Sequence, residues 1–305
     1  MKKILTLILI SMLSYLPVFA DELEDDYLDI ASNYCVVGDY SSAMQYLDKV
    51  LAKNPSNQRA ADLKRGLAHV ISKDKKSFLD NVNPLIKQAM EYKRLGDDAA
   101  ELNTLNQAAQ GQNSYLAYFY LGNFYRDKHQ YQKALDAYNS STSAKSDFAP
   151  AYLSTGVLLY EIGRYNSVLN PLDKYLTFNP NDDLAYAVKS RAEFQLGMLN
   201  ASKADNNRAL QINRCPEYLF DKAKILYKEG KYQEARDLFT SLLDNIQTSK
   251  IYEYIGLCDY AMGHYNTALV NYDKAIILSD DDEYLEARYN EIKQILENQQ
   301  NEKEE

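Results

Sequence analysis

Histidine, cysteine and clustered carboxylates, the residue types most often used in catalysis and metal binding, are sparse and scattered in this sequence. The three histidines, His69, His129 and His264, stand in separate segments, without a histidine, cysteine or aspartate at metal-ligand spacing. The acidic run Asp280–Glu283 lacks the alternating ligands and the glycine of a calcium loop, and it suits a helix N-terminus better. Phosphate-binding loops and nucleophile elbows are also absent. The sequence therefore predicts no catalytic residues, no metal site, no cofactor and no enzymatic activity.

The cysteines are three in number and lie far apart along the chain. Cys35 and Cys258 stand inside apolar helical patterns, where cysteine behaves as a small buried hydrophobe. Cys215 lies between two expected helices and is the more exposed thiol. In an exported protein, an odd cysteine could instead pair with one in another chain.

The charge balance limits the classes of partner. The chain carries 34 basic and 43 acidic residues, a formal net charge of −9. Nucleic-acid binding requires a basic face, and anionic lipid attracts basic segments, so both partners are disfavoured. The sequence also shows no site for a small-molecule substrate.

The first twenty residues have the pattern of a secretory signal peptide. Lys2 and Lys3 precede an apolar run from Ile4 to Tyr15, and the segment ends in a small residue, Ala20. An uncleaved anchor helix is the alternative, but the run is short for a bilayer span, which needs about 20 residues. We expect cleavage after Ala20, a periplasmic or secreted protein, and no transmembrane span in the mature chain.

From Val82 on, the sequence repeats with a period of 33 or 34 residues. Repeat units begin at Glu24, Val82, Tyr115, Ala149, Asp183, Pro216 and Ser249. Glycine recurs at the eighth position in Gly122, Gly156 and Gly256, and at the fifteenth in Gly38, Gly96, Gly163, Gly197, Gly230 and Gly263. A glycine at position fifteen ends a helix, and one at position eight lets a second helix approach closely. Each unit is therefore expected to fold as two helices.

Tyrosine at position seventeen and alanine at position twenty complete the pattern, as in Tyr131 with Ala134 and Tyr265 with Ala268. These residues resemble the tetratricopeptide repeat, a helix-turn-helix of about 34 residues. The resemblance implies an all-α solenoid, a right-handed superhelix of antiparallel helix pairs with six to seven repeats and a C-terminal capping helix. It also implies that the first helices of the pairs line a concave groove.

The repeat pattern divides the chain into six segments. They are a signal peptide (1–20), a first repeat (21–57), a degenerate repeat or joint (58–81), a main array (82–280), a capping helix (281–297) and a disordered tail (298–305). Pro171 falls inside a second helix, where we expect a kink. The unit from Asp183 carries Ser190, Ser202 and Asn206 at core positions, and we expect it to be the least well packed.

One face of the first helices is a candidate binding groove. Positions two, five, nine and twelve share this face by helical spacing, and position twelve is aromatic in four successive units. The predicted groove residues are Phe119, Asn123, Leu153, Tyr160, Arg191, Phe194, Phe220, Lys224, Tyr227 and Tyr260. The alternative is that the aromatic residues pack within the array. A clamp for a C-terminal carboxylate is excluded, because Phe119 replaces the lysine that such repeats carry four residues before the asparagine.

The sequence thus predicts a non-catalytic scaffold or adaptor that binds a protein or peptide segment with apolar anchors. Resemblance to exported bacterial repeat proteins implies a role in envelope assembly, secretion or cell-wall machinery. The alternative function is a structural repeat module that assembles with itself into dimers or higher oligomers. The sequence does not identify the partner.

Overall fold

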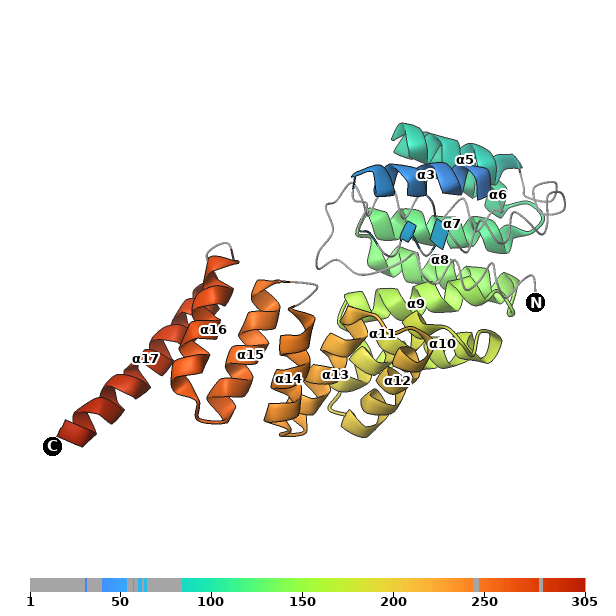
Figure 1. Ribbon diagram of the computed structural model, residues 1–305. Coiled ribbons are helices and arrows are strands. Elements are labelled where there is room, and N and C mark those ends of the chain that lie inside the picture. The colour runs from blue at the N-terminus through green and yellow to red at the C-terminus, as the bar shows by residue number, and fades with distance from the viewer. Residues whose placement is uncertain are drawn as a thin grey trace. The chain divides into compact units, whose positions relative to one another are not determined.

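All regular structure in the described part of the chain is α-helical, and these residues contain no strand (Figure 1). The computed structural model describes residues 84–243, 247–279 and 282–304, and before them 40–53 with the single residues 31, 57, 60, 61, 63 and 64. The all-α prediction is confirmed. The predicted signal peptide, Cys35 and nearly all of the segment 58–81 lie outside the described residues.

From α5 to α16 the helices follow one another with short connections, two helices to each predicted repeat. In chain order they are α3 (Tyr40–Lys53), α5 (Pro84–Leu95), α6 (Asp98–Ala109), α7 (Ser114–Asp127), α8 (Tyr131–Ala144), α9 (Ala149–Glu161), α10 (Tyr165–Phe178), α11 (Asp183–Gln195), α12 (Leu199–Ile212), α13 (Pro216–Lys228), α14 (Tyr232–Leu242), α15 (Ser249–Ala261), α16 (Tyr265–Ile277) and α17 (Glu283–Glu304).

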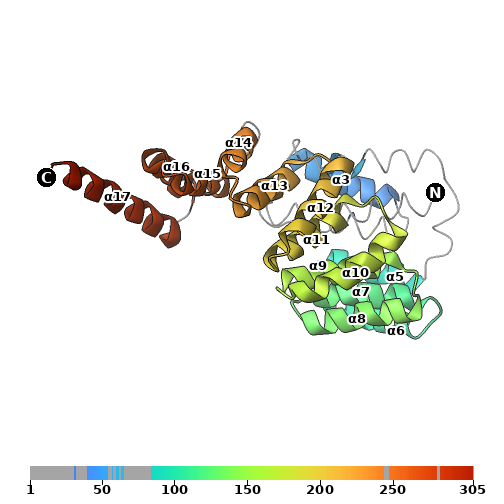
Figure 2. The ribbon, with the colours of Figure 1, turned by 90° about the horizontal axis from the view of Figure 1, so that it is seen from below.

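The chain divides into two compact units, Met1–Ala192 and Glu193–Glu305, and the division falls within α11. In the first unit α5 packs on α6, α7 on α8 and α9 on α10. In the second unit α13 packs on α14 and α15 on α16, and α17 lies beside α16 (Figures 1 and 2). Each unit has its own hydrophobic core.

In each repeat from α5 to α16, the turn between the two helices depends on a left-handed backbone conformation. Gly163 connects α9 to α10 with a φ of +74°, which costs glycine little. The turn between α7 and α8 uses His129 instead, with a φ of +55°. The prediction that position fifteen ends the first helix is confirmed at both places.

Close packing of the two helices explains the glycine at position eight. A Cβ atom added to Gly156 would lie 2.5 Å from Cδ2 of Leu172, and one added to Gly256 would lie 2.9 Å from the ring of Tyr272. The same holds for Gly122 and the ring of Tyr138. The side chain at position twenty-four of the repeat, which lies in the second helix, therefore fills the space that the glycine leaves.

Two predicted irregularities can be located. Helix α10 runs without interruption from Tyr165 to Phe178, so Pro171 lies inside it and does not end it. In α12, Asn206 is 1% exposed at position twenty-four, where the other units bury a large apolar side chain. Its Nδ2 donates to the carbonyl of Tyr218, but its Oδ1 has no partner in the described structure.

The last helix is longer than the sequence pattern predicts. Helix α17 runs from Glu283 to Glu304. The sequence pattern had predicted a capping helix that ends at Glu297 and a disordered tail after it. Leu285 and Ile292, which are 1% and 2% exposed, bury one side of α17 in the core cluster that it shares with α16. This is the cover that the end of a repeat array needs.

Candidate protein-binding surface

Helix α13 places three predicted groove residues on one face. Phe220, Lys224 and Tyr227 follow one another at intervals of four and three residues, so their side chains project from the same side. The helix begins at Pro216, whose fixed φ and missing N–H suit the first turn. All three side chains are partly exposed.

Phe220 packs against a buried aromatic residue from the next helix, and Tyr254 joins this residue to Tyr227. Phe239 of α14 is fully buried; Phe220 packs edge-on to it at 5.2 Å, and Tyr254 of α15 stacks on it at 5.0 Å between ring centroids. Tyr254 also contacts Phe220 at 5.3 Å and Tyr227 at 6.4 Å, both edge-on. Phe220, Tyr227 and Tyr254 thus form a partly exposed aromatic rim around Phe239. We call these three residues, with Phe194 and Lys224, the aromatic surface.

Lys224 connects Phe194 of α11 to this rim. Its Nζ lies 5.0 Å from the centroid of the Phe194 ring and 5.9 Å from that of Phe220, which are cation–π distances. The same Nζ lies 3.8 Å from a carboxylate oxygen of Asp221. The positive charge of Lys224 is therefore already compensated, and the surface is mainly apolar in character.

Tyr254 was missed by the sequence prediction. It stands at position six of its unit, outside the face formed by positions two, five, nine and twelve. Tyr120 is the aromatic counterpart at that position in the unit from Tyr115, but the other units from Val82 to Pro216 have Lys87, Ser154, Val188 and Asp221 there. Periodicity therefore provides no signal for Tyr254.

Tyr260, also a predicted groove residue, is engaged by the C-terminal helix. The guanidinium of Arg288 lies 5.4 Å from the centroid of its ring, and its hydroxyl donates to Glu291 at 3.4 Å. The Tyr260 ring also contacts the ring of Tyr265 at 5.6 Å between centroids. Tyr260 thus fastens α17 to α15.

In the first unit, two predicted groove residues lie in the core. Phe119 is 4% exposed and packs edge-on against Phe148 at 5.4 Å, and Leu153 is 2% exposed. Both belong to the buried core, and not to an exposed groove as the sequence pattern predicted. Helical periodicity assigns Phe119 to a face of its helix. It does not show that Phe148, which lies just before the next helix, covers that face.

The remaining predicted residues of the first unit also make internal contacts. Asn123 accepts a hydrogen bond from the hydroxyl of the buried Tyr138 at 2.7 Å. Arg191 is 9% exposed. The Tyr160 ring contacts Tyr165 at 5.5 Å, as Tyr227 contacts Tyr232 and Tyr260 contacts Tyr265. Position twelve therefore recurs as an aromatic residue partly because it packs on position seventeen of its own unit.

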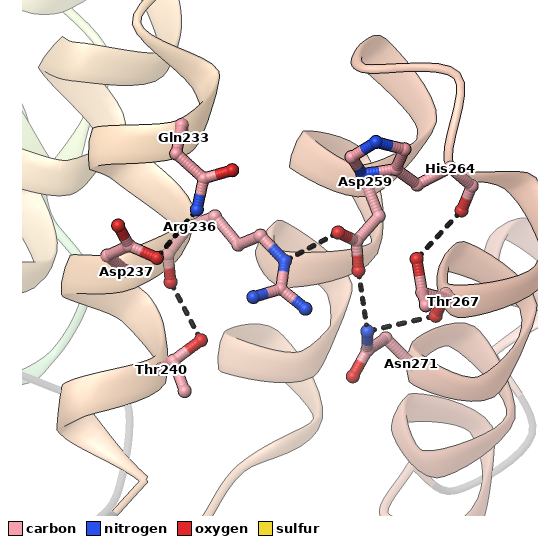
Figure 3. A network of polar contacts seen from close by, with 8 residues as sticks. All are labelled: Gln233, Arg236, Asp237, Thr240, Asp259, His264, Thr267 and Asn271. Carbon is pink, nitrogen blue, oxygen red and sulfur yellow. Dashed lines mark hydrogen bonds and ion pairs between the residues drawn. The ribbon is translucent and has the colours of Figure 1, made fainter.

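A buried polar network holds the helices that frame the aromatic surface. Asp259 of α15 is fully buried and accepts from Nε of Arg236 in α14 at 2.5 Å and from Nδ2 of Asn271 in α16 at 2.9 Å (Figure 3). Asn271 also donates to the carbonyl of Thr267. Since three helices meet at one carboxylate, the network fixes α15, and with it Tyr254, against α14.

The described residues offer little else for chemistry. They contain no group of three or more His, Cys, Asp or Glu side chains arranged to hold a metal ion. Burial raises the pKa of Cys258 to about 12, so this thiol is inert. The imidazole of His129 lies in a turn and shares a hydrogen bond with the hydroxyl of Tyr131.

None of the helices in the described part of the chain is long and apolar enough to span a bilayer.

Comparison with known proteins agrees with this architecture. Residues 216–247 match the tetratricopeptide repeat family. No curated protein matches the sequence at a significant level.

Solved structures are similar over larger parts of the chain. The structure of PilW, described as a widely conserved type IV pilus biogenesis factor, has a TM-score of 0.57 and 20% identity, with 68% of this chain and 99% of that chain covered. YrrB, described as a repeat protein with an unusual peptide-binding site, has a TM-score of 0.52 and 18% identity, with 61% and 97% covered. A repeat protein from Parabacteroides merdae covers 89% of this chain at a TM-score of 0.48 and 17% identity, and 99% of its own length is matched. At these identities the similarity to PilW and YrrB is one of fold, and that fold is the tetratricopeptide solenoid.

Proposed function

We propose that this tetratricopeptide repeat protein is a non-catalytic scaffold that binds a segment of a partner protein on the aromatic surface of its second unit. The observation that carries the proposal is the rim of Phe220, Tyr227 and Tyr254 around the buried Phe239. Tyrosine and phenylalanine provide large contact areas with few rotatable bonds, and they dominate the energetics of interfaces. Partly exposed rings that are held on rigid helices are suited to that role.

The chemistry of the surface defines the segment that fits it. The aromatic rings offer apolar and edge-on contacts, so the partner should present apolar or aromatic anchors. Because Asp221 lies 3.8 Å from Lys224, the lysine does not require an acidic residue in the partner. An amphipathic helix or an extended peptide could supply such anchors.

Truncation of the aromatic surface tests this function. A partner captured by cross-linking in the host would be purified, and its affinity measured by calorimetry against the wild-type chain and the double variant Phe194→Ala with Tyr227→Ala. Loss of an aromatic side chain at an interface centre costs about 2 kcal/mol or more, which is about thirtyfold in affinity. We expect the double variant to lose at least this much while circular dichroism shows unchanged helicity.

Two control variants separate this surface from others. Tyr131→Ala removes a partly exposed tyrosine of the first unit, and Glu234→Lys changes an exposed charge on α14. Both should bind the partner as the wild type does. Unchanged affinity in the double aromatic variant would exclude the aromatic surface as the binding site.

We propose further that the chain is exported, since its first twenty residues have the signal-peptide pattern. Its partners would then belong to envelope assembly, secretion or cell-wall machinery. PilW, a pilus biogenesis factor, serves one such machine. Its similarity to this chain is limited to the fold. The partner recovered by cross-linking would identify the pathway.

A further inference from the structure

The exposed face of α16 carries an apolar stripe. Val270 is 55% exposed and Ile277 is 73% exposed, and their spacing of seven residues places them on the same side of the helix. Leu278, 48% exposed, and Tyr284, 51% exposed, extend the apolar area toward α17. Most of the large apolar side chains that the described residues expose are therefore concentrated at this end of the second unit.

The repeat fold does not require this stripe. The two positions, twenty-two and twenty-nine of the unit, are exposed and polar or small in the other second helices: Asp136 and Ser143 in α8, Asn170 and Thr177 in α10, and Ala204 and Gln211 in α12. Single exposed apolar residues are common on protein surfaces, but two apolar residues seven positions apart, on a face that is polar or small in the other repeats, indicate an interaction site.

The charges between the two apolar residues indicate what covers the stripe. Asp273 and Lys274 lie on the same exposed face, midway between Val270 and Ile277. If a second α16 lies antiparallel across this face, Val270 meets Ile277 of the second copy, and Asp273 meets Lys274 of the second copy. A twofold axis then repeats both pairs, so the face is complementary to itself. We propose that a second copy of this chain docks here through an antiparallel contact between the two α16 helices.

Helix α10 provides an internal comparison. It has the same acid and base, Asp173 and Lys174, but Asn170 and Thr177 flank them, and Asp173 forms an ion pair with Lys189 at 2.8 Å. In α16, Asp273 forms no hydrogen bond or ion pair with the residues that the structure describes. Lys274 extends over the ring of Tyr252, with Nζ 5.3 Å from its centroid. The charge pair of α16 therefore combines an apolar flank with an acid that a second copy can engage.

The dimer should be weak and reversible. A contact between two single helices buries less than the roughly 1,200 Å² of the smallest stable interfaces. The chain also has a formal net charge of −9, which opposes self-association at low ionic strength. Sedimentation velocity over a range of concentrations at moderate salt is the appropriate measurement.

An apolar exchange tests the stripe. The full chain with Val270→Asn and Ile277→Thr carries the residues that α10 has at these positions. Because both side chains are more than half exposed, the variant should keep its helicity and melting temperature. We expect the wild type to show a sedimentation coefficient that rises with concentration, and the variant to stay monomeric. A wild type that remains monomeric at the highest concentration, or a variant that still dimerises, would overturn the proposal.

A charge exchange tests the antiparallel geometry. Asp273→Lys alone, or Lys274→Asp alone, places like charges opposite each other and should weaken the dimer about tenfold or more. The two single variants mixed in equal amounts restore both opposite-charge pairs, so a heterodimer should form. The double variant Asp273→Lys with Lys274→Asp should dimerise as the wild type does. If the mixture associates no better than either variant alone, this pairing is wrong. A variant on another helix, Glu234→Lys, should leave the dimer unchanged.

Discussion

At the scale of single residues, the repeat positions act as matched pairs. Gly156 leaves the space that Leu172 fills, and Gly256 does the same for Tyr272. The glycine of one helix and the large apolar residue of the other therefore pack as a pair. The effect of substituting one on stability should depend on the other.

Substitution of Gly156 tests this coupling. In Gly156→Ala the new Cβ would lie 2.5 Å from Cδ2 of Leu172, so either the Leu172 side chain or one of the two helices must shift. Overpacking of this kind costs about 1–3 kcal/mol, and urea unfolding should show a lower midpoint. In the background of Leu172→Ala the same substitution should cost much less, because the clashing methyl groups are gone. Equal losses in the two backgrounds would show that the clash is not the cause.

At the scale of helices, the interface of α5, α6 and α7 contains a buried acid. Glu101 of α6 is 7% exposed. It lies among Lys93 of α5, Asp98 of α6, Asp127 at the end of α7 and Lys128 just after it. These four residues form two ion pairs, Lys93 with Asp127 and Lys128 with Asp98. Burial raises the pKa of Glu101 from 4.5 to about 7, with the two lysines opposing the shift and the two aspartates adding to it.

The raised pKa predicts a pH-dependent stability. The folded chain favours protonated Glu101, so its stabilising effect is complete below the unfolded pKa of 4.5 and is lost as the pH rises to about 7. The loss would be at most about 3 kcal/mol, at 1.36 kcal/mol per pKa unit. Glu101→Gln stays neutral, so it should resemble the wild type near pH 4 and exceed it in stability at about pH 8. A stability difference that does not change with pH would contradict the prediction.

The helices could be predicted from the sequence because their signals are local. Gly163 and its counterparts end the first helices where the pattern places them. The aromatic surface was predicted only in part. Phe194, Phe220, Lys224 and Tyr227 do come together, but the burial of Phe119 depends on Phe148 and the rim includes Tyr254. The spacing within one repeat does not show that its last residue, Phe148, folds back over Phe119, or that Tyr254 of the following repeat joins Phe220 and Tyr227. The compensation of Lys224 by Asp221 was visible, since the two residues are one helical turn apart.

At the scale of the molecule, the second unit concentrates the features that contact with other chains would use. The aromatic surface lies on α11, α13 and α15, and the apolar stripe lies on α16. One chain could therefore bind a partner and a second copy without competition between them. The Asp259 network links the helices that carry both features. Its loss in Arg236→Ala should therefore disturb both, whereas the variants of Phe194 and Ile277 should act separately.

Export is the prediction that concerns the whole chain. Two lysines precede the apolar run from Ile4 to Tyr15, which is shorter than the roughly 20 residues of a bilayer span, and Ala20 ends the segment with a small side chain. We expect a signal peptidase to cleave after Ala20, so that the protein isolated from its host begins at Asp21. The intact mass of the purified protein measures this directly. A mass that includes the first twenty residues, with the protein recovered in the membrane fraction, would instead assign the apolar run as an anchor that tethers the repeat array to the membrane surface.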